Sequence, residues 1–374
     1  MPPIVPPLAA VFAMLPEYRH ARGKRHSLTA LLLLACVAML GGARGPSGIA
    51  EWAKHHGEPW RTRLGLTHRK GPSQSTVQRL FAHIAVETLE AQLAHWAQQV
   101  LAALPPLDAA TLDAVAMDGK TLRMSARCGA ADPHLLSLYS HRLGLVLAQV
   151  AVAAKTNEIG ASDAVLAHLL LTGVVVTGDA IFTQTMIAQT LLDQGNDYLL
   201  VVKENQPTLH DDLVTLFADP DAVVQTVDER DTHSQRLERR RLTVSTELVG
   251  YSDWPGLAQA LCIERRRTDM RTGETSIEAA YAVTSLPPER ATPRQLLTLW
   301  RGHWLIENRL HYVRDVTYGE DRATVRAGRS AQALAAIRNV AIGLLRLAGE
   351  TNIAAGCRRY HAQPARALAA VGII

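Results

Sequence analysis

The stretch that decides the fold is residues 291–322, ATPRQLLTLWRGHWLIENRLHYVRDVTYGEDR, which has the pattern of one long helix. Thr292 suits the N-cap, Pro293 suits the first helical position, and Gln295 completes a capping box of the Thr-x-x-Gln type. From there to about Val316 the chain contains no proline and a single glycine. The sequence therefore predicts a helix that begins at Pro293 and continues to about Val316.

Four side chains of this helix share one face, because they fall at positions i, i+3, i+7 and i+14. They are Trp300, His303, Glu307 and Arg314. An acid with bases one and two turns away can hold a metal ion beside a phosphate backbone. An amphipathic helix with a solvated ion pair between Glu307 and Arg314 explains the same residues, so this stretch alone leaves both interpretations open.

The composition is that of an ordinary folded protein with a small excess of basic residues. The chain has 374 residues, of which 48% are hydrophobic and 20% charged, and this excludes a disordered chain and allows two or three domains. The formal net charge is +4 and the isoelectric point about 8.9. That balance is compatible with a nucleic-acid partner, and the excess is concentrated in arginine-rich segments such as 236–241 and 265–267.

Cysteine usage and hydropathy indicate a cellular location. The four cysteines are scattered without a Cys-x-x-Cys pair, which predicts free thiols in a reducing compartment. The longest apolar run, Leu28 to Leu40, is shorter than the roughly 20 residues that span a bilayer. The N-terminus lacks the basic region of a secretory signal. We therefore expect a cytoplasmic protein with no membrane partner.

Residues 1–108 predict an all-helical domain, in which Ser27 caps a buried helix. The segment KGPSQSTVQRLFAHI (70–84) resembles the second helix of a helix-turn-helix, whose first turn faces base edges. Gln78 and Arg79 are then candidate DNA contacts. A capped surface helix in a helical bundle explains the same pattern, and both interpretations stay open.

From residue 109 to 219 the pattern changes to strands and helices. The pattern indicates three meandering strands, followed by helix, strand, helix and strand. This order predicts a mixed α/β sheet with helices on its faces. Two acids, Asp118 and Asp179, fall at or just past the ends of separate strands. Open α/β sheets bind ligands in the crevice outside their strand ends. We therefore take both acids as candidate site residues.

Residues 220–290 interrupt this alternating series. Three segments with strand patterns predict an inserted β-rich subdomain that is rich in arginine on its exposed faces. The chain then returns to the α/β core over residues 291–350, which include the Glu307 helix, and residues 351–374 form a C-terminal tail.

Three carboxylates, those of Asp118, Asp179 and Glu307, combine into a candidate metal site. Hard oxygen ligands of this kind suit Mg²⁺ or Mn²⁺. Two such ions about 3.5–4 Å apart activate a nucleophile and stabilise the leaving oxygen in phosphodiester displacement. The sequence therefore predicts a pair of Mg²⁺ or Mn²⁺ ions.

Five motifs carry a resemblance to a known family. They are MDGKTL (117–122), KTNEI (155–159), VTGDAIFTQ (176–184), DYLLVVKENQ (197–206) and RGHWLIENRLHYVRDVTYGED (301–321). Together with two N-terminal segments, they make nearly the whole chain resemble the DDE-type transposases of bacterial insertion sequences. The resemblance is greatest to the branch that contains the H-repeat-associated proteins.

This resemblance implies a ribonuclease H-like catalytic core with the β-rich insertion before its last acidic helix. It implies that Asp118, Asp179 and Glu307 are the catalytic, metal-binding triad. The activity implied is metal-dependent cleavage at the ends of an insertion sequence, followed by strand transfer into target DNA. The partner is then double-stranded DNA, both the terminal repeats and the target, and two ends to be processed imply a homodimer on the DNA.

Related transposases carry a Tyr-x2-Arg-x3-Glu-x6-Lys signature, and the same spacing here reads Trp300, His303, Glu307, Arg314. The resemblance implies DNA contacts by Trp300, by His303 with its neighbour Arg301, and by Arg314. The Arg314 guanidinium keeps a fixed charge that can grip a phosphate, whereas His303 loses part of its charge near neutral pH. Lys120 and Lys203 are candidate contacts to the DNA backbone, and for each a solvated surface charge explains the residue equally well.

Three alternative functions share the predicted fold, metal site or DNA binding with a transposase. A simple metal-dependent nuclease has the same fold and metals, and only a product with joined ends distinguishes a transposase from it. An inactive or domesticated remnant that binds DNA is a second alternative, against which the intact acids argue. A small-molecule phosphohydrolase is disfavoured by the arginine-rich insertion and by the helical N-terminal domain.

Overall fold

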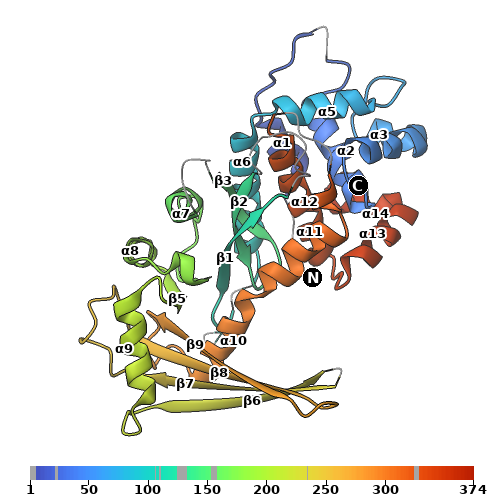
Figure 1. The fold of residues 1–374 in the computed structure, drawn as a ribbon. Coiled ribbons are helices and arrows are strands. Elements are labelled where there is room, and N and C mark those ends of the chain that lie inside the picture. Colours follow the sequence, from blue (N-terminus) through green and yellow to red (C-terminus); the bar gives the residue numbers. More distant parts are fainter. Residues whose placement is uncertain are drawn as a thin grey trace. The chain divides into compact units, whose positions relative to one another are not determined.

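The computed structural model of the chain (Figure 1) describes residues 6–21, 24–105, 107–108, 111–123, 133–152, 158–233, 235–323 and 328–374. Its strands form a nine-stranded mixed sheet with the order β3-β2-β1-β4-β5-β9-β8-β7-β6. The strands are β1 Ala114–Thr121, β2 His134–Ser140, β3 Val146–Val152, β4 Val175–Gly178, β5 Asp197–Val202, β6 Gln225–His233, β7 Arg236–Ser245, β8 Gln259–Asp269 and β9 Thr275–Thr284.

Strand β4 pairs in parallel with both β1 and β5, whereas β2 with β3, β5 with β9, and the successive pairs from β6 to β9 are antiparallel. The predicted mixed α/β sheet is therefore confirmed. The four strands of the predicted insertion extend this sheet, because β9 pairs with β5. The sequence missed β6, whose segment QTVDERDTH alternates charged residues on both faces and so lacks an apolar period.

The chain divides into two compact units. The first contains Met1–Pro106, Gly119–Leu170 and Leu305–Ile374, and the second contains Leu107–Asp118 and Leu171–Trp304. Strand β1 passes from one to the other, with Asp118 as the last residue of the second unit's segment. These boundaries cut across the predicted domains, so the domain division at residues 108, 219, 290 and 350 stays a prediction.

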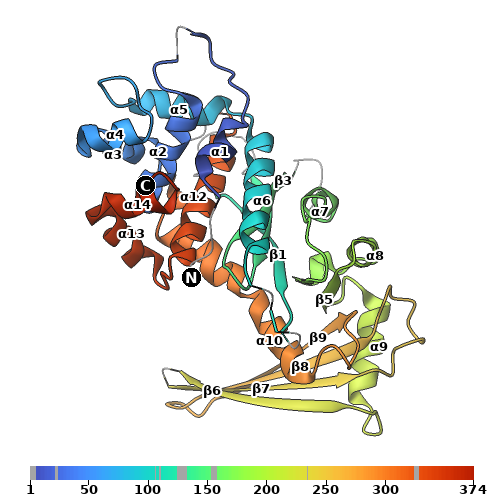
Figure 2. The ribbon, with the colours of Figure 1, turned by 180° about the vertical axis from the view of Figure 1, so that it is seen from behind.

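The first unit contains β2, β3 and most of the helices. These helices are α1 Leu8–Ala13, α2 Leu28–Leu40, α3 Pro46–His55, α4 Gly57–Arg63, α5 Gln74–His83, α6 Val86–Ala102, α7 Glu158–Leu166, α11 Tyr312–Val316, α12 Ser330–Leu347, α13 Ile353–Ala362 and α14 Pro364–Ala370. Every residue of α2 except Thr29 is buried, and the Ser27 hydroxyl accepts from the Ala30 N–H at 3.1 Å, so the predicted cap is confirmed. A helix that is apolar all round belongs in a core, and α2 packs on α12, which also packs on α6 (Figures 1 and 2).

The second unit packs helices on both faces of its strands. Its helices are α8 Thr185–Asp193, α9 Pro207–Ala218 and α10 Pro293–His303. Ala280 and Ala282 of β9 lie in the hydrophobic cluster that contains Leu296 and Trp300 of α10. Between them in sequence, Tyr281 lies against His210 and Phe217 of α9 instead. Since successive strand residues point to opposite faces, α9 and α10 cover opposite faces of this part of the sheet.

The predicted long helix is interrupted. Its start is confirmed, because Thr292 and Gln295 form the capping box before α10, but α10 ends at His303. A π-helical turn, Glu307–His311, follows and leads into α11. A π turn bonds residue i to i+5 and so changes the angle between successive side chains, which removes the common face predicted from a 3.6-residue period. Among the described residues, no helix is both long and apolar enough to cross a membrane.

Candidate functional site

Two acids lie at matching positions of the neighbouring strands β1 and β4. Met117 of β1 is paired with Gly178 of β4 in a parallel ladder, and the next residues along the chain are Asp118 and Asp179. Adjacent parallel strands lie about 4.8 Å apart, so the two acids are neighbours on the side of the sheet toward which the carboxyl ends of β1 and β4 point. The residues before them are fully enclosed, whereas both acids are half-buried. The predicted strand-end position is confirmed for Asp179, which directly follows β4, and is wrong for Asp118, because β1 continues for three residues beyond this acid to Thr121.

Asp179 also organises the backbone that follows it. Its carboxylate oxygen Oδ1 accepts from the Ala180 N–H at 2.7 Å, at the start of a short 3₁₀ turn, Ala180–Phe182. The same oxygen accepts from Lys203 Nζ at 3.3 Å, and the Lys203 side chain is mostly exposed. The structure thus places one predicted DNA-contacting lysine beside one predicted catalytic acid.

Glu307 begins the π-helical turn and His311 ends it. His311 is buried and donates from Nδ1 to Glu307 Oε2 at 3.1 Å, while the Glu307 side chain is about half exposed. This hydrogen bond lowers the pKa of Glu307 below its ordinary value, and burial lowers the pKa of His311. Sequence reasoning missed His311, although its i+4 spacing from Glu307 was a usable signal.

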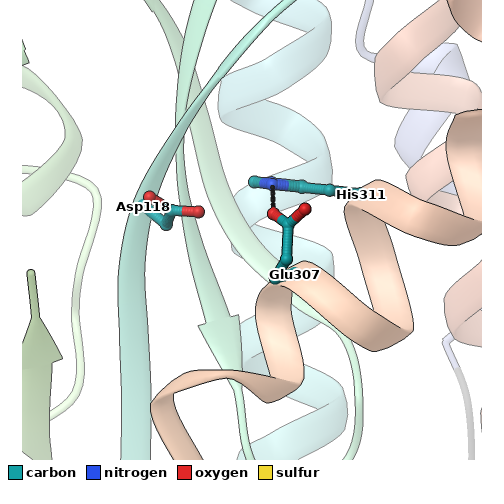
Figure 3. A group of neighbouring side chains, drawn as sticks. All are labelled: Asp118, Glu307 and His311. Carbon is teal, nitrogen blue, oxygen red and sulfur yellow. Dashed lines mark hydrogen bonds and ion pairs between the residues drawn. The ribbon is translucent and has the colours of Figure 1, made fainter. Parts of the chain in front are cut away.

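Asp118, Glu307 and His311 form a group with metal-ligand spacing (Figure 3). Each offers one ligand atom, and these atoms all lie within 4.8 Å of one another. The two carboxylates are hard donors suited to Mg²⁺ or Mn²⁺, and the imidazole is a ligand more typical of transition ions such as Mn²⁺ or Zn²⁺. The donor chemistry therefore fits a divalent cation. Asp179 is not a member of this group among the described residues.

Two residues of the predicted polar face are buried in the second unit. Trp300 lies in the hydrophobic cluster and is 6% exposed. His303 is 7% exposed, and its Nδ1 lies 3.1 Å from Thr177 Oγ1. Burial lowers the pKa of His303 to about 4, more than the Asp179 charge raises it. His303 is thus neutral at pH 7, and neither side chain presents a cation to a phosphate.

The two arginines predicted as DNA contacts in this segment, Arg314 and Arg301, differ in exposure. Arg314 is fully buried, and its Nε donates to Glu320 Oε2 at 2.7 Å. The alternative interpretation, a solvated ion pair between Glu307 and Arg314, is therefore wrong, because Arg314 is buried and pairs with Glu320. Arg301 is exposed and pairs with Glu229 at 2.5 Å.

The other predicted DNA contacts lie in the first unit. Lys120 is 9% exposed, and its Nζ donates to Asp315 Oδ2 at 2.6 Å with Asp321 Oδ1 at 4.0 Å. Its charge is therefore largely satisfied within the protein. On α5, Gln78 is half-buried and Arg79 is exposed, so Arg79 has surface available for a ligand.

Gly119, beside Asp118, has no room for a side chain. A Cβ there would lie 2.5 Å from both Glu158 Oε1 and His134 Nε2, which themselves form an ion pair at 2.6 Å. We expect Gly119→Ala to lower the free energy of unfolding by about 1–3 kcal/mol, because the ion pair must move apart. Urea unfolding measures this change, with Gly45→Ser as the control, since no atom lies within 4 Å of a Cβ at Gly45. A Gly119→Ala variant as stable as the wild type would contradict the prediction.

Comparison with known proteins gives matches along most of the chain. The family described as Transposase DDE domain matches residues 110–344, and the family described as DDE_Tnp_1-associated matches residues 9–97. An uncharacterized protein in the dhlA 3'region of Xanthobacter autotrophicus is 34% identical over 290 residues, which are 73% of this chain and 92% of that protein.

Two further relatives come from Escherichia coli. The H repeat-associated putative transposase YhhI of strain K12 is 28% identical, over 89% of this chain and 88% of that protein. The putative transposase YncI of O157:H7 is 29% identical, over 89% of this chain and 86% of that protein. Among solved structures, the piggyBac transposase synaptic complex with hairpin DNA is similar at a TM-score of 0.43 and 9% identity, over 97% of this chain and 76% of that chain.

Proposed function

This chain belongs to the transposase DDE family, and on that premise we propose that it cleaves DNA at the ends of an insertion sequence and joins the freed ends to target DNA. The observation that carries the proposal is the placement of three acids. Asp118 and Asp179 follow strand residues that are paired in register, and ligand atoms of Asp118 and Glu307 lie within 4.8 Å of each other.

The catalytic core is, on this proposal, ribonuclease H-like. Support comes from the strand order β3-β2-β1-β4-β5, in which β2 and β3 are antiparallel and β1, β4 and β5 are parallel. Helices α7 and α8 follow β3 and β4 in the chain, as the alternation of strand and helix requires. The strands β6 to β9 then form the insertion before the helix that leads to Glu307.

The residues have distinct roles in this mechanism. Asp118, Asp179 and Glu307 would hold divalent cations, Mg²⁺ or Mn²⁺. Such ions, when bound, would supply the Lewis-acid chemistry of phosphodiester displacement. His311 orients the Glu307 carboxylate through its hydrogen bond, and buried hydrogen-bond partners of ligands serve this purpose in metal sites. The exposed Lys203 side chain lies beside Asp179, with Nζ 3.3 Å from its carboxylate, where on this proposal the DNA backbone approaches.

The exposed members of the predicted DNA-contacting set, Lys203, Arg301 and Arg79, contact phosphates on this proposal, and Gln78 lies one residue from Arg79. The buried members hold the site's elements in place instead. They are Lys120, Trp300, His303 and Arg314. His303, for example, joins α10 to β4 through Thr177.

The test is strand cleavage of labelled duplex DNA that carries the element's own ends, with and without Mg²⁺ or Mn²⁺. We expect metal-dependent nicks at the element's end and a product joined to target DNA, both abolished by Asp179→Asn. Asp163→Asn, at an exposed position of α7, is the matched control and keeps full activity. Nicks without joined product would identify a nuclease, and binding without nicks in the wild type would identify a DNA-binding remnant.

The active assembly is, on this proposal, a homodimer on DNA, because two element ends need two sites. Light scattering of the complex with end DNA is expected to give the mass of two chains. A complex with one chain would contradict this assembly while leaving the cleavage assay as an independent test.

A further inference from the structure

The strands β6, β7 and β8 extend beyond the hydrophobic cluster of the second unit, and there both faces carry charged side chains. One face continues the surface that packs on α10. It is marked by Leu242 and Ile263, which are opposite each other in register and belong to the cluster with α10. Side chains alternate between the two faces along each strand. The residues next to Leu242 on β7 and next to Ile263 on β8, and every second residue from them, therefore point to the opposite face.

The face on the α10 side is balanced in charge. Its acids are matched one for one by arginines, and most lie in ion pairs: Arg240 and Arg265 with Glu238, Arg267 with Glu238 and Glu278, and Arg301 with Glu229 and Asp231. The strand arginines Arg240, Arg265 and Arg267 on this side therefore need no outside partner to neutralise them.

The opposite face carries a row of like charges. Arg239 of β7 is directly opposite both Arg230 of β6 and Arg266 of β8, so three arginines lie side by side across three antiparallel strands. We name Arg230, Arg239 and Arg266 the arginine row. Like charges at directly opposed positions destabilise a sheet. The row is therefore an arrangement that folding alone disfavours.

The protein neutralises this row only in part. Arg239 pairs with Asp228 at 2.9 Å, and the pKa of Asp228 is lowered by its hydrogen bond with Arg239 and by the charges of Arg241 and Arg230. Within the described ranges, Arg230 and Arg266 are exposed and have no acid within 4.0 Å. On this face, four arginines accompany two acids, Asp228 and Glu264. A row of arginines that is neutralised only in part, on a sheet whose other face pairs most of its arginines with acids, indicates an anionic partner.

We propose that the arginine row, with Arg241 beside it, docks the phosphate backbone of double-stranded DNA, an inference that rests on the proposed function. Three adjacent strands span about 10 Å, over which duplex DNA carries roughly six charges. The planar guanidinium group binds phosphate bidentately, and contacts of this kind supply affinity without reading sequence. The row is therefore a non-specific DNA-positioning surface.

The test compares two double variants that each remove two positive charges from the same sheet. Arg230→Gln with Arg266→Gln removes the two unpaired members of the row. Arg236→Gln with Arg271→Gln is the control. Both arginines are exposed, but neither belongs to the arginine row: Arg236 lies on the α10 side of β7, and Arg271 lies in the turn between β8 and β9. Binding to a fluorescent duplex is measured by anisotropy at several salt concentrations in EDTA, so that no cleavage is needed.

We expect the row variant to bind more weakly to duplexes of unrelated sequence, with the slope of log affinity against log salt reduced in magnitude by about 2. The control keeps the wild-type slope. The melting temperature of the row variant is not lowered, because removing like charges relieves repulsion. A wild-type slope in the row variant, or a lowered melting temperature together with weaker binding, would overturn the docking surface.

The outcomes separate this inference from the proposed function. Metal-dependent cleavage by the wild type is measured on its own, with the element's ends. A reduced salt slope without any wild-type cleavage supports the docking surface and overturns the transposase mechanism. Cleavage by the wild type with an unchanged slope in the row variant overturns the docking surface alone.

Discussion

Replacing Glu307 with alanine is expected to lower the rate of metal-dependent DNA cleavage by about 1,000-fold or more. Losing a carboxylate ligand removes several kcal/mol of charge stabilisation, and each 1.4 kcal/mol corresponds to a factor of ten. The Glu307 side chain is about half exposed at the start of the π-helical turn, so the substitution is expected to lower the cleavage rate without disturbing the packing of the hydrophobic core. The measurement is the single-turnover rate on labelled end DNA with saturating protein.

The control for this variant is Glu247→Ala, which removes an exposed acid of the second unit. Both variants are expected to keep the wild-type melting temperature. The salt dependence of DNA binding also stays unchanged in both, since neither side chain belongs to the arginine row. Cleavage by Glu307→Ala at a rate within tenfold of the wild type would refute the assignment of Glu307 to the triad.

Replacing Glu320 with alanine is expected to destabilise the protein by about 3–5 kcal/mol, because it leaves two buried guanidinium groups without their acid. Glu320 is 3% exposed; Oε2 accepts from Arg314 at 2.7 Å and Oε1 accepts from Arg338 at 2.8 Å. Arg338 also donates to the Arg44 carbonyl at 2.8 Å, so the network joins the N-terminal and C-terminal segments of the first unit. Denaturant unfolding measures the loss.

The control is Glu51→Ala, since among the described residues Glu51 forms an exposed i, i+4 pair with His55, and such pairs contribute about 0.5 kcal/mol or less.

The pH dependence of the stability gives a second check. Burial alone would raise the pKa of Glu320, but the charges of Arg314 and Arg338 lower it below its ordinary value. The stabilisation by the Glu320 carboxylate is therefore complete above the ordinary pKa of glutamate and is lost as the pH falls through the lowered pKa of Glu320. Equal stability of Glu320→Ala and Glu51→Ala would contradict the network's role.

Sequence reasoning succeeded where local chemistry decides the structure. The capping residues of the α2 and α10 helices and the position of Asp179 just past a strand end follow from propensity and hydrophobic period, and these predictions are confirmed. The strand that carries Asp118 runs on past the acid, because charged and polar residues can continue a strand that its neighbours hold in the sheet. The five motifs also identified the family correctly, because they are long and occur in the right order.

The failures occur where tertiary contacts override local pattern. A charged residue at i+7 from Glu307 looks solvated on a helical wheel, yet Arg314 is enclosed because Glu320 and the π-helical turn supply its environment. His311 looked like one more polar residue, since nothing in the sequence shows that Asp118 lies within reach of it. The strand β6 was hidden because its partners, not its own composition, hold it in the sheet.

The segmental make-up of the first unit has a consequence for biosynthesis. Helix α2 leaves the ribosome long before α12, on which it packs. At ordinary rates of translation the delay is on the order of tens of seconds. During this time a helix that is apolar on every side lacks its partner, so the nascent chain is a substrate for chaperones. A chain terminated before α12 cannot complete this core, and truncated copies of the gene are expected to yield aggregated product.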